Sequence, residues 1–159
     1  GHSADDIRGA AVAFAGAHAS FDAPPVSVQR IGRFQAFAFT APSEAMESLA
    51  ADCVTVFDRF RAMPSDDELA KRRARGLSAR QEAYLQAWGY PYVMEEFRFH
   101  MTMLGSTSDE ALHAAVTAYL TPRAAHLAEQ PLAVDAVCLY RQETRQAPFL
   151  LVERFPFSG

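Results

Sequence analysis

Three polar side chains alternate with apolar ones in the segment EFRFHMTML, residues 95–103. Because successive side chains of a β-strand point to opposite faces, Arg98, His100 and Thr102 would share one face. A guanidinium, an imidazole and a hydroxyl are polar groups that do not pack well in a hydrophobic core. All three can donate hydrogen bonds to a phosphate. We therefore expect a strand over 95–104 whose polar face opens onto a cleft. The other face would consist of Phe97, Phe99, Met101 and Met103, and we expect Phe97, Phe99 and Met101 to pack against helices.

Each of these residues also has an ordinary structural interpretation. His100 can be a histidine satisfied by a single hydrogen bond, and Arg98 can be an exposed residue on a strand edge. Upstream, Tyr90 and Tyr92 flank Pro91, which favours an extended or turn conformation. The two tyrosines either wall the cleft, where they would stack on a base or a ribose, or pack under a loop.

The overall composition is that of an ordinary globular protein. The chain has 159 residues, of which 50% are hydrophobic and 21% charged, enough for one domain or for two small lobes that share a core. Its formal net charge of −4 argues against a general binder of polyanions, which usually carries an excess of basic residues. No apolar run approaches the ~20 residues of a membrane span, and no segment resembles a signal peptide. We therefore expect a cytoplasmic protein without a membrane partner.

The cysteines, the other histidines and the basic residues give no sign of a metal or nucleic-acid site. Cys53 and Cys138 each lie in an apolar run, so we expect buried free thiols, and their wide spacing fits neither a zinc knuckle nor a disulfide framework. His113 and His126 have no cysteine or carboxylate at ligand spacing, so no metal or other cofactor is expected. The basic run at 71–75 comes two residues after three acidic residues at 66–68, which predicts a solvated helix face rather than an RNA track.

Apolar periodicity and capping residues predict a mixture of helices and antiparallel strands. Helices are expected over 4–18 and 43–61. Two short helices, capped by Ser65 and Ser78, are expected between 64 and 89, and a further helix is expected from a cap at Ser108 to about Leu120. Strands are expected over 25–31, 33–39, 95–104, 131–141 and 148–156. Together these elements indicate an α+β fold.

The order of these elements repeats. The second half runs strand, helix, strand, strand, whereas the first half runs helix, strand, strand and lacks a leading strand. A lobe made of helix 4–18 and the 25–39 hairpin would then have an incomplete sheet, with unpaired backbone groups that folded proteins avoid. We expect that place to be filled by residues outside the given sequence, by a neighbouring chain or by rearranged strands.

The 18-residue block WGYPYVMEEFRFHMTMLG, residues 88–105, closely resembles the signature of DUF1045, a family of bacterial proteins often described as phosphonate metabolism proteins. A His-x-Thr strand repeated in two pseudo-symmetric lobes is typical of the 2H phosphoesterase superfamily. The resemblance covers nearly the whole chain and implies a bilobal, 2H phosphoesterase-like (LigT-like) α+β fold, in which two antiparallel sheets with outer helices surround a central cleft. In this single domain, residues 1–62 would form the incomplete N-terminal lobe, 63–93 a helical connector and 94–159 the C-terminal lobe.

The resemblance also implies a chemistry. Superfamily members act on cyclic phosphodiesters or ligate RNA ends. One imidazole removes a proton while the other protonates the departing oxygen, each Thr hydroxyl stabilises charge on the phosphate oxygens, and no metal is required. His100 and Thr102 match the second motif and would be catalytic. Arg98, Tyr90 and Tyr92 would bind the substrate, a small phosphorylated molecule or a nucleotide.

The first His-x-Thr motif, which the resemblance puts just before helix 4–18, is not in the given sequence. The letters HAS at 18–20 have the right spacing, but they fall at the end of a helix and do not count as a motif. Of the three ways to complete the first sheet, residues outside the given sequence therefore fit the resemblance best. Without them, one chain holds only one imidazole of the pair.

Three function classes remain open. The first is a 2H-type phosphoesterase that acts without a metal on a small cyclic phosphodiester or a phosphonate-pathway intermediate. The second is an RNA-end 2′,3′-cyclic phosphodiesterase or ligase-like enzyme, which needs a basic groove leading to His100 and is disfavoured by the net charge. The third is a non-catalytic module that binds a phosphate ligand, which the missing first histidine favours for this chain.

Overall fold

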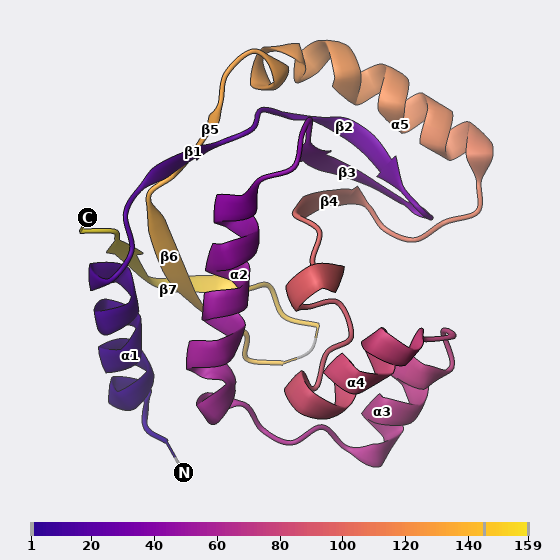
Figure 1. The fold of residues 1–159 in the computed structure, drawn as a ribbon. Coiled ribbons are helices and arrows are strands. Elements are labelled where there is room, and N and C mark those ends of the chain that lie inside the picture. The colour runs from indigo at the N-terminus through magenta and orange to yellow at the C-terminus, as the bar shows by residue number, and fades with distance from the viewer. Residues whose placement is uncertain (1, 145, 159) are drawn as a thin grey trace. The chain divides into compact units, whose positions relative to one another are not determined.

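The computed structural model describes residues 2–144 and 146–158. Helices and antiparallel sheets are both present, which confirms the predicted α+β class (Figure 1). The helices are α1 (Ala4–Gly16), α2 (Glu44–Phe57), α3 (Asp66–Arg73), α4 (Ala79–Trp88) and α5 (Glu110–Arg123), with 3₁₀ turns η1 (Asp58–Phe60), η2 (Met94–Glu96) and η3 (Ala125–Ala128). The strands are β1 (Phe21–Ala23), β2 (Val26–Ile31), β3 (Phe34–Phe39), β4 (His100–Leu104), β5 (Leu132–Val134), β6 (Ala136–Arg141) and β7 (Leu150–Pro156). None of the helices in the described residues is long and apolar enough to cross a membrane.

The described residues fall into two compact units. Unit 1 consists of residues 2–21, 50–96, 134–144 and 146–158, and unit 2 consists of residues 22–49 and 97–133. Of the predicted site residues, Tyr90 and Tyr92 belong to unit 1, whereas Arg98, His100 and Thr102 belong to unit 2.

A three-stranded antiparallel sheet in the order β2-β3-β4 forms the centre of unit 2. Gly32 closes the turn between β2 and β3 with a φ of 58°, in the left-handed region that glycine adopts without steric cost. Helix α5 packs against β2 and β3 (Figure 1). Arg30 on β2 is joined to Glu110 in the first turn of α5 by two hydrogen bonds, which fasten the start of the helix to the sheet.

The register of this sheet sorts its side chains into two faces, because directly opposite residues of antiparallel strands lie on the same face. Arg30 and Gln35 pair with each other and both contact α5, so their row, which includes Phe37 and Met101, is the helix-facing side. The opposite face carries small and polar side chains from all three strands. They are Ser27 and Gln29 of β2, Ala36 and Ala38 of β3, and His100 and Thr102 of β4.

Helix α1 packs against the β6–β7 hairpin in unit 1. Ser3 begins the helix through a capping box with Asp6. Ala11 and Ala15 of α1 form a buried cluster with Phe155 of β7. The apolar side of α1 is therefore covered by a hairpin from the other end of the chain.

Two short helices, α3 and α4, occupy the segment for which two were predicted. Ser65 caps α3 in a capping box with Glu68, as predicted, and Ser78 caps α4 with Gln81 as its reciprocal partner. Gly89 ends α4 in the left-handed conformation, with a φ of 69°.

The element order repeats as predicted, but the helices are exchanged between the repeats. The order α1-β1-β2-β3 matches the order α5-β5-β6-β7. However, α1 packs against β6 and β7 while α5 packs against β2 and β3, so the predicted grouping of helix 4–18 with the 25–39 hairpin is wrong. The physical reason is that an apolar helix face has to be covered, but the face itself does not specify which hairpin covers it. Because β4 fills the place beside β3, rearranged strands complete that sheet, not residues outside the given sequence.

The strand predicted over 95–104 is shorter in the structure. Met94–Glu96 forms η2, Met94 has a φ of 52°, and pairing with β3 begins only at His100. Residues 97–99 lead into the strand without belonging to it. The strand predicted over 131–141 is likewise divided into β5 and β6.

The helix after β4 begins and ends later than predicted. Asp109 is the N-cap in place of Ser108, and its carboxylate accepts a hydrogen bond from the N–H of Leu112. The helix continues past Leu120 and includes Pro122. Proline has no backbone N–H, so Pro122 removes one hydrogen-bond donor from the helix. The helix tolerates this loss because few helical residues follow Pro122.

Candidate functional site

His100 and Thr102 lie on β4, on the small and polar face of the sheet in unit 2. Both residues are exposed, and their direct partners on β3, Ala38 and Ala36, are buried. An alanine carries only a methyl group, so no large side chain of β3 fills the space beside the imidazole and the hydroxyl. The two residues therefore share one accessible face, as the alternation predicted.

The backbone fixes the tautomer of His100. Its Nδ1 atom lies 2.7 Å from the carbonyl oxygen of Arg98. Because a carbonyl oxygen only accepts hydrogen bonds, Nδ1 carries the proton of the neutral ring and donates it. Within residues 2–144 and 146–158, Nε2 has no hydrogen-bond partner. The ring is thus oriented by one nitrogen and available for chemistry through the other.

Ser27 and Gln29 also lie on this face, although neither was predicted to be a site residue. The Gln29 amide donates to Ser27 Oγ at 3.1 Å and to the carbonyl oxygens of Ala38 and Phe39 at 3.2 and 2.9 Å. These bonds tie the side chain to the sheet that carries His100. The signal was present in the alternation of VSVQRI, which repeats the pattern seen in β4.

Arg98 lines a cavity of about 500 Å³ in unit 2. The cavity is formed by the β2–β3 hairpin, the start of α2 and the segment before β4, with Gln29, Phe39, Ser43 and Phe99 among its lining residues. The Arg98 side chain is exposed and makes no ion pair with another residue in the described ranges. His100 and Thr102, the two predicted catalytic residues, are not among the residues that line this cavity.

The apolar residues around β4 do not form the buried face that was predicted. Phe97 and Phe99 are half-buried, and Phe99 stacks on Phe39 with ring centroids 4.1 Å apart. Met101 and Met103 are 40% and 48% exposed, so the expectation of packing against helices is wrong for Met101. The reason is topological: α5 packs against β2 and β3, and β4 lies at the edge of the sheet.

Tyr90 and Tyr92 lie between α4 and η2 in unit 1. Their rings meet edge to face with centroids 5.6 Å apart, on either side of the buried Pro91. The guanidinium carbon of Arg72 lies 4.8 Å from the centroid of the Tyr90 ring. Both tyrosines are exposed as well as packed, and their role in substrate binding stays a prediction.

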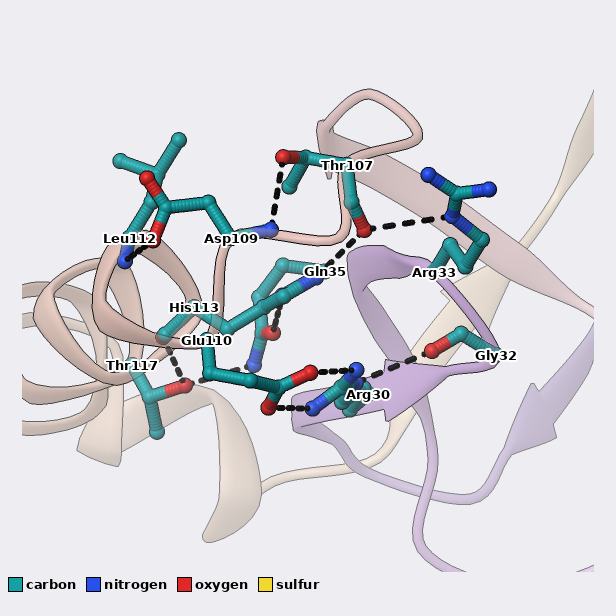
Figure 2. Close-up of polar contacts among 10 residues, drawn as sticks. All are labelled: Arg30, Gly32, Arg33, Gln35, Thr107, Asp109, Glu110, Leu112, His113 and Thr117. Atoms are coloured by element: carbon teal, nitrogen blue, oxygen red, sulfur yellow. Dashed lines mark hydrogen bonds and ion pairs between the residues drawn. The ribbon is translucent and has the colours of Figure 1, made fainter.

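A buried polar network joins α5 to β3 on the face opposite His100 (Figure 2). Gln35 and His113 are only 2% and 3% exposed. Gln35 Nε2 donates to Thr117 Oγ1 at 2.8 Å, and Thr117 Oγ1 donates to the carbonyl oxygen of His113 at 2.9 Å. Gln35 Oε1 therefore accepts from His113 Nδ1, at 3.1 Å. His113 fastens the helix to the sheet and does not belong to the exposed face.

His18 and the basic run make hydrogen bonds and ion pairs with neighbouring residues of the fold. His18 follows α1, with Nδ1 2.7 Å from the carbonyl oxygen of Phe14 and Nε2 3.2 Å from an Asp52 carboxylate oxygen, so HAS lies after a helix as predicted. In the basic run, Arg73 is paired with Glu82 at 2.8 Å. No group of three or more His, Cys, Asp or Glu side chains that could hold a metal ion occurs in the described parts of the chain.

Comparison with known proteins gives one family and one curated relative. A family model described as "Protein of unknown function (DUF1045)" matches residues 1–150. The chain is 40% identical, over 166 aligned residues, to a protein of Janthinobacterium sp. (strain Marseille) named "Ribose 1,5-bisphosphate phosphokinase PhnN". That alignment covers 100% of this chain and 36% of the relative, so the chain spans about a third of the relative's length. No solved structure gives a significant match.

Proposed function

The chain belongs to the DUF1045 family, and from this premise we propose that it supplies one acid/base half of a 2H-type phosphoesterase site. His100 would be the acid/base residue and Thr102 the hydroxyl donor to the phosphate. The observation that carries the proposal is the hydrogen bond from His100 Nδ1 to the Arg98 carbonyl oxygen, at 2.7 Å. It orients an exposed imidazole and leaves Nε2 for proton transfer.

The acid/base step follows from that geometry. In the neutral ring Nε2 has a lone pair and can take a proton from water or from a hydroxyl group. After proton transfer, Nε2–H can return the proton to a departing oxygen, while Nδ1–H stays bonded to the backbone. Imidazole suits this exchange because its ordinary pKa lies closer to neutral pH than that of any other side chain.

Thr102 and Arg98 would act on the phosphate itself. The Thr102 hydroxyl lies on the same face as the imidazole, two residues along β4, and can donate to a phosphate oxygen as negative charge develops. Arg98 is exposed and without an ion pair among the described residues, so its five N–H donors are available to an anion.

A second imidazole is needed for the complete 2H reaction. In unit 2 the other described histidines are His113 in α5 and His126 in η3, and neither belongs to a strand of the sheet that carries His100. The repeat of element order supports a two-lobed, LigT-like fold whose second histidine comes from elsewhere in the protein. We therefore assign this chain one member of the pair.

The substrate we propose is a small cyclic phosphodiester or a phosphorylated intermediate of phosphonate metabolism. The curated relative is named for a ribose bisphosphate, which agrees with a phosphorylated small molecule. Its kinase activity is not carried over, because the single lysine here, Lys71, is followed by Arg72 and cannot belong to the phosphate-binding motif GxxxxGK[ST]. An RNA substrate is less favoured, since the net charge is −4 and part of the basic run is paired with Glu82.

Hydrolysis of a 2′,3′-cyclic nucleotide in the presence of EDTA tests the proposal. The protein expressed from its native start should turn over the substrate with the chelator present, and His100→Ala should lower kcat at least ~10²-fold, the typical effect of a positioned acid or base. His126→Ala, which removes an exposed histidine of the same unit, is the matched control and should leave kcat unchanged. Activity that survives His100→Ala, or that requires a divalent ion, would refute the assigned role.

A further inference from the structure

The polar face of the sheet in unit 2 is arranged in two rows that cross its three strands. Residues that pair directly make up each row: Ser27, Ala38 and His100 form the first, and Gln29, Ala36 and Thr102 form the second. Each row therefore places the methyl group of an alanine between two polar side chains. The polar side chains on β4 are the proposed catalytic ones, whereas those on β2, Ser27 and Gln29, have been given no function so far.

The orientation of the Gln29 amide is fixed by its nitrogen. Nε2 donates to the carbonyl oxygens of Ala38 and Phe39 at 3.2 and 2.9 Å and to Ser27 Oγ at 3.1 Å. Because a carbonyl oxygen only accepts hydrogen bonds, turning the amide around would place Oε1 against two acceptors. Oε1 is therefore the end of the amide without a backbone partner, and no residue in the ranges 2–144 and 146–158 donates to it.

Ser27 contributes the complementary group. Its Oγ accepts from Gln29 Nε2, which leaves the hydroxyl hydrogen to donate elsewhere, and that hydrogen has no acceptor in the described parts of the chain. Strand β2 thus presents an acceptor, Gln29 Oε1, and a donor, the Ser27 hydroxyl, which are joined through one amide. A hydroxyl group of a ligand matches both, because it donates and accepts, whereas an ammonium group can only donate.

The space beside these side chains is large enough for a small molecule. Gln29 and Ala38 both line the cavity of about 500 Å³ in unit 2. Because Ala38 pairs directly with His100, the cavity adjoins the row that carries the imidazole. A phosphate at His100 would therefore have its organic part next to Gln29. Sites for small molecules usually combine apolar surface with a few placed polar groups, and Phe39 and Phe99 supply the apolar surface of this cavity.

We propose that Gln29 and Ser27 determine the substrate specificity of the site by binding a hydroxyl group on the organic part of the substrate. This inference rests on the proposed function, which places the phosphate at His100 and Thr102. The substrate hydroxyl donates to Gln29 Oε1 and accepts from the Ser27 hydroxyl. Cyclic phosphates that carry a hydroxyl group beside the reacting ring are then favoured over alkyl analogues, because a methyl group leaves both protein groups without a partner.

Two cyclic phosphates that differ by one hydroxyl group test the inference. Glycerol 1,2-cyclic phosphate has a hydroxymethyl group where propane-1,2-diol cyclic phosphate has a methyl group. Each compound is titrated into the His100→Ala form of the protein expressed from its native start, so that neither is consumed, and binding is followed through the amide NMR signals of β2. We expect the dissociation constant of the glycerol compound to be at least about fivefold lower, the effect of one neutral hydrogen bond.

Substitutions on β2 identify the residues responsible. Gln29→Leu should bring the ratio of the two dissociation constants to about one by removing the acceptor, and Ser27→Ala should lower the ratio at least about twofold by removing the donor. A loss of folded protein cannot produce these changes, because it affects both titrations of a variant alike. Ser106→Ala, which removes an exposed serine hydroxyl of the same unit, is the matched control and should keep the preference.

The outcomes separate this inference from the proposed function. Equal binding of the two compounds, binding of neither, or a preference that survives both β2 substitutions would overturn the role of Gln29 and Ser27. Hydrolysis in EDTA that depends on His100 would in that case still support the phosphoesterase. Conversely, a hydroxyl preference that depends on Gln29, in a protein without any hydrolytic activity, would support the binding role and refute the proposed reaction.

Discussion

Replacing Gln35 by leucine tests how unit 2 holds its catalytic face in place. Leucine has a similar size but no amide, so it removes the partner of His113 Nδ1 and the donor to Thr117 Oγ1. Both of those atoms lie between α5 and β3, and His113 is 3% exposed, so water cannot easily replace the amide. An unsatisfied buried donor costs about 1–3 kcal/mol, and the lost hydrogen bond to Thr117 adds about 1 kcal/mol. We therefore expect Gln35→Leu to lower the free energy of unfolding by about 2–4 kcal/mol.

A double-mutant cycle separates the hydrogen bond from the change in packing. His113→Leu alone leaves the Gln35 amide oxygen unsatisfied, whereas the double substitution removes both partners and leaves neither atom orphaned. The double variant should therefore be less destabilised than the sum of the single variants, with a coupling free energy of about 1–3 kcal/mol. The measurement is urea unfolding at neutral pH, with each variant's m-value checked against the wild type.

Gln86→Leu is the matched control, because it makes the same chemical change at an exposed position of α4. It should change the free energy of unfolding by no more than about 0.5 kcal/mol. The reasoning is refuted if Gln35→Leu is as mild as the control, or if the two single effects simply add. Either result would mean that water or a rearranged side chain satisfies His113.

Four further predictions concern other parts of the chain. Burial raises the pKa of the Cys53 thiol from 9.0 to about 11, so its thiolate fraction at pH 8 is about 100-fold lower than that of an ordinary thiol. Iodoacetamide should therefore label the exposed Cys138 before Cys53 in a time course followed by peptide mass. By the same shift, the stability that protonated Cys53 contributes is fully present below about pH 9 and is lost as the pH rises toward 11, a loss that Cys53→Ala should abolish in unfolding curves. Ser65→Ala should cost about 1 kcal/mol in urea unfolding by removing the cap of α3, whereas Ser106→Ala in an exposed turn should be neutral. Arg98→Lys should raise KM for a cyclic phosphate more than it lowers kcat, because a lysine keeps the charge but loses the forked donor, and an unchanged KM would remove Arg98 from the site.

Local patterns in the sequence predicted local structure well. The capping residues Ser3, Ser65 and Ser78 all begin helices, because a side-chain acceptor next to free N–H groups acts over a few residues only. The alternation in FRFHMTM placed His100 and Thr102 on one face for the same reason, since period-two geometry is a property of the strand itself.

The pairing of distant elements could not be predicted from such patterns. Helix 4–18 and the 25–39 hairpin are neighbours in the sequence, yet α1 packs against β6 and β7. An apolar stripe specifies that a helix must be covered, but any hairpin with an apolar face can cover it. The sequence pattern therefore predicts the repeated order of elements. It does not specify which hairpin each helix packs against.

The β-bulge between β3 and β4 explains why Met103 does not stand opposite a residue on the helix-facing side of the sheet. Ala36 pairs with Thr102, but Gln35 pairs with Leu104, so Met103 is the extra residue of the bulge. Without the bulge Met103 would stand opposite Gln35 on the side of α5, and Leu104 would lie on the face of His100. With it, the half-buried Leu104 takes the place beside Gln35 and Met103 stays 48% exposed. Met101 stands opposite Phe37 on the correct side, but α5 covers β2 and β3 and stops short of the edge strand. The register beyond the bulge thus keeps Leu104 off the polar face, which leaves His100 and Thr102 next to alanines.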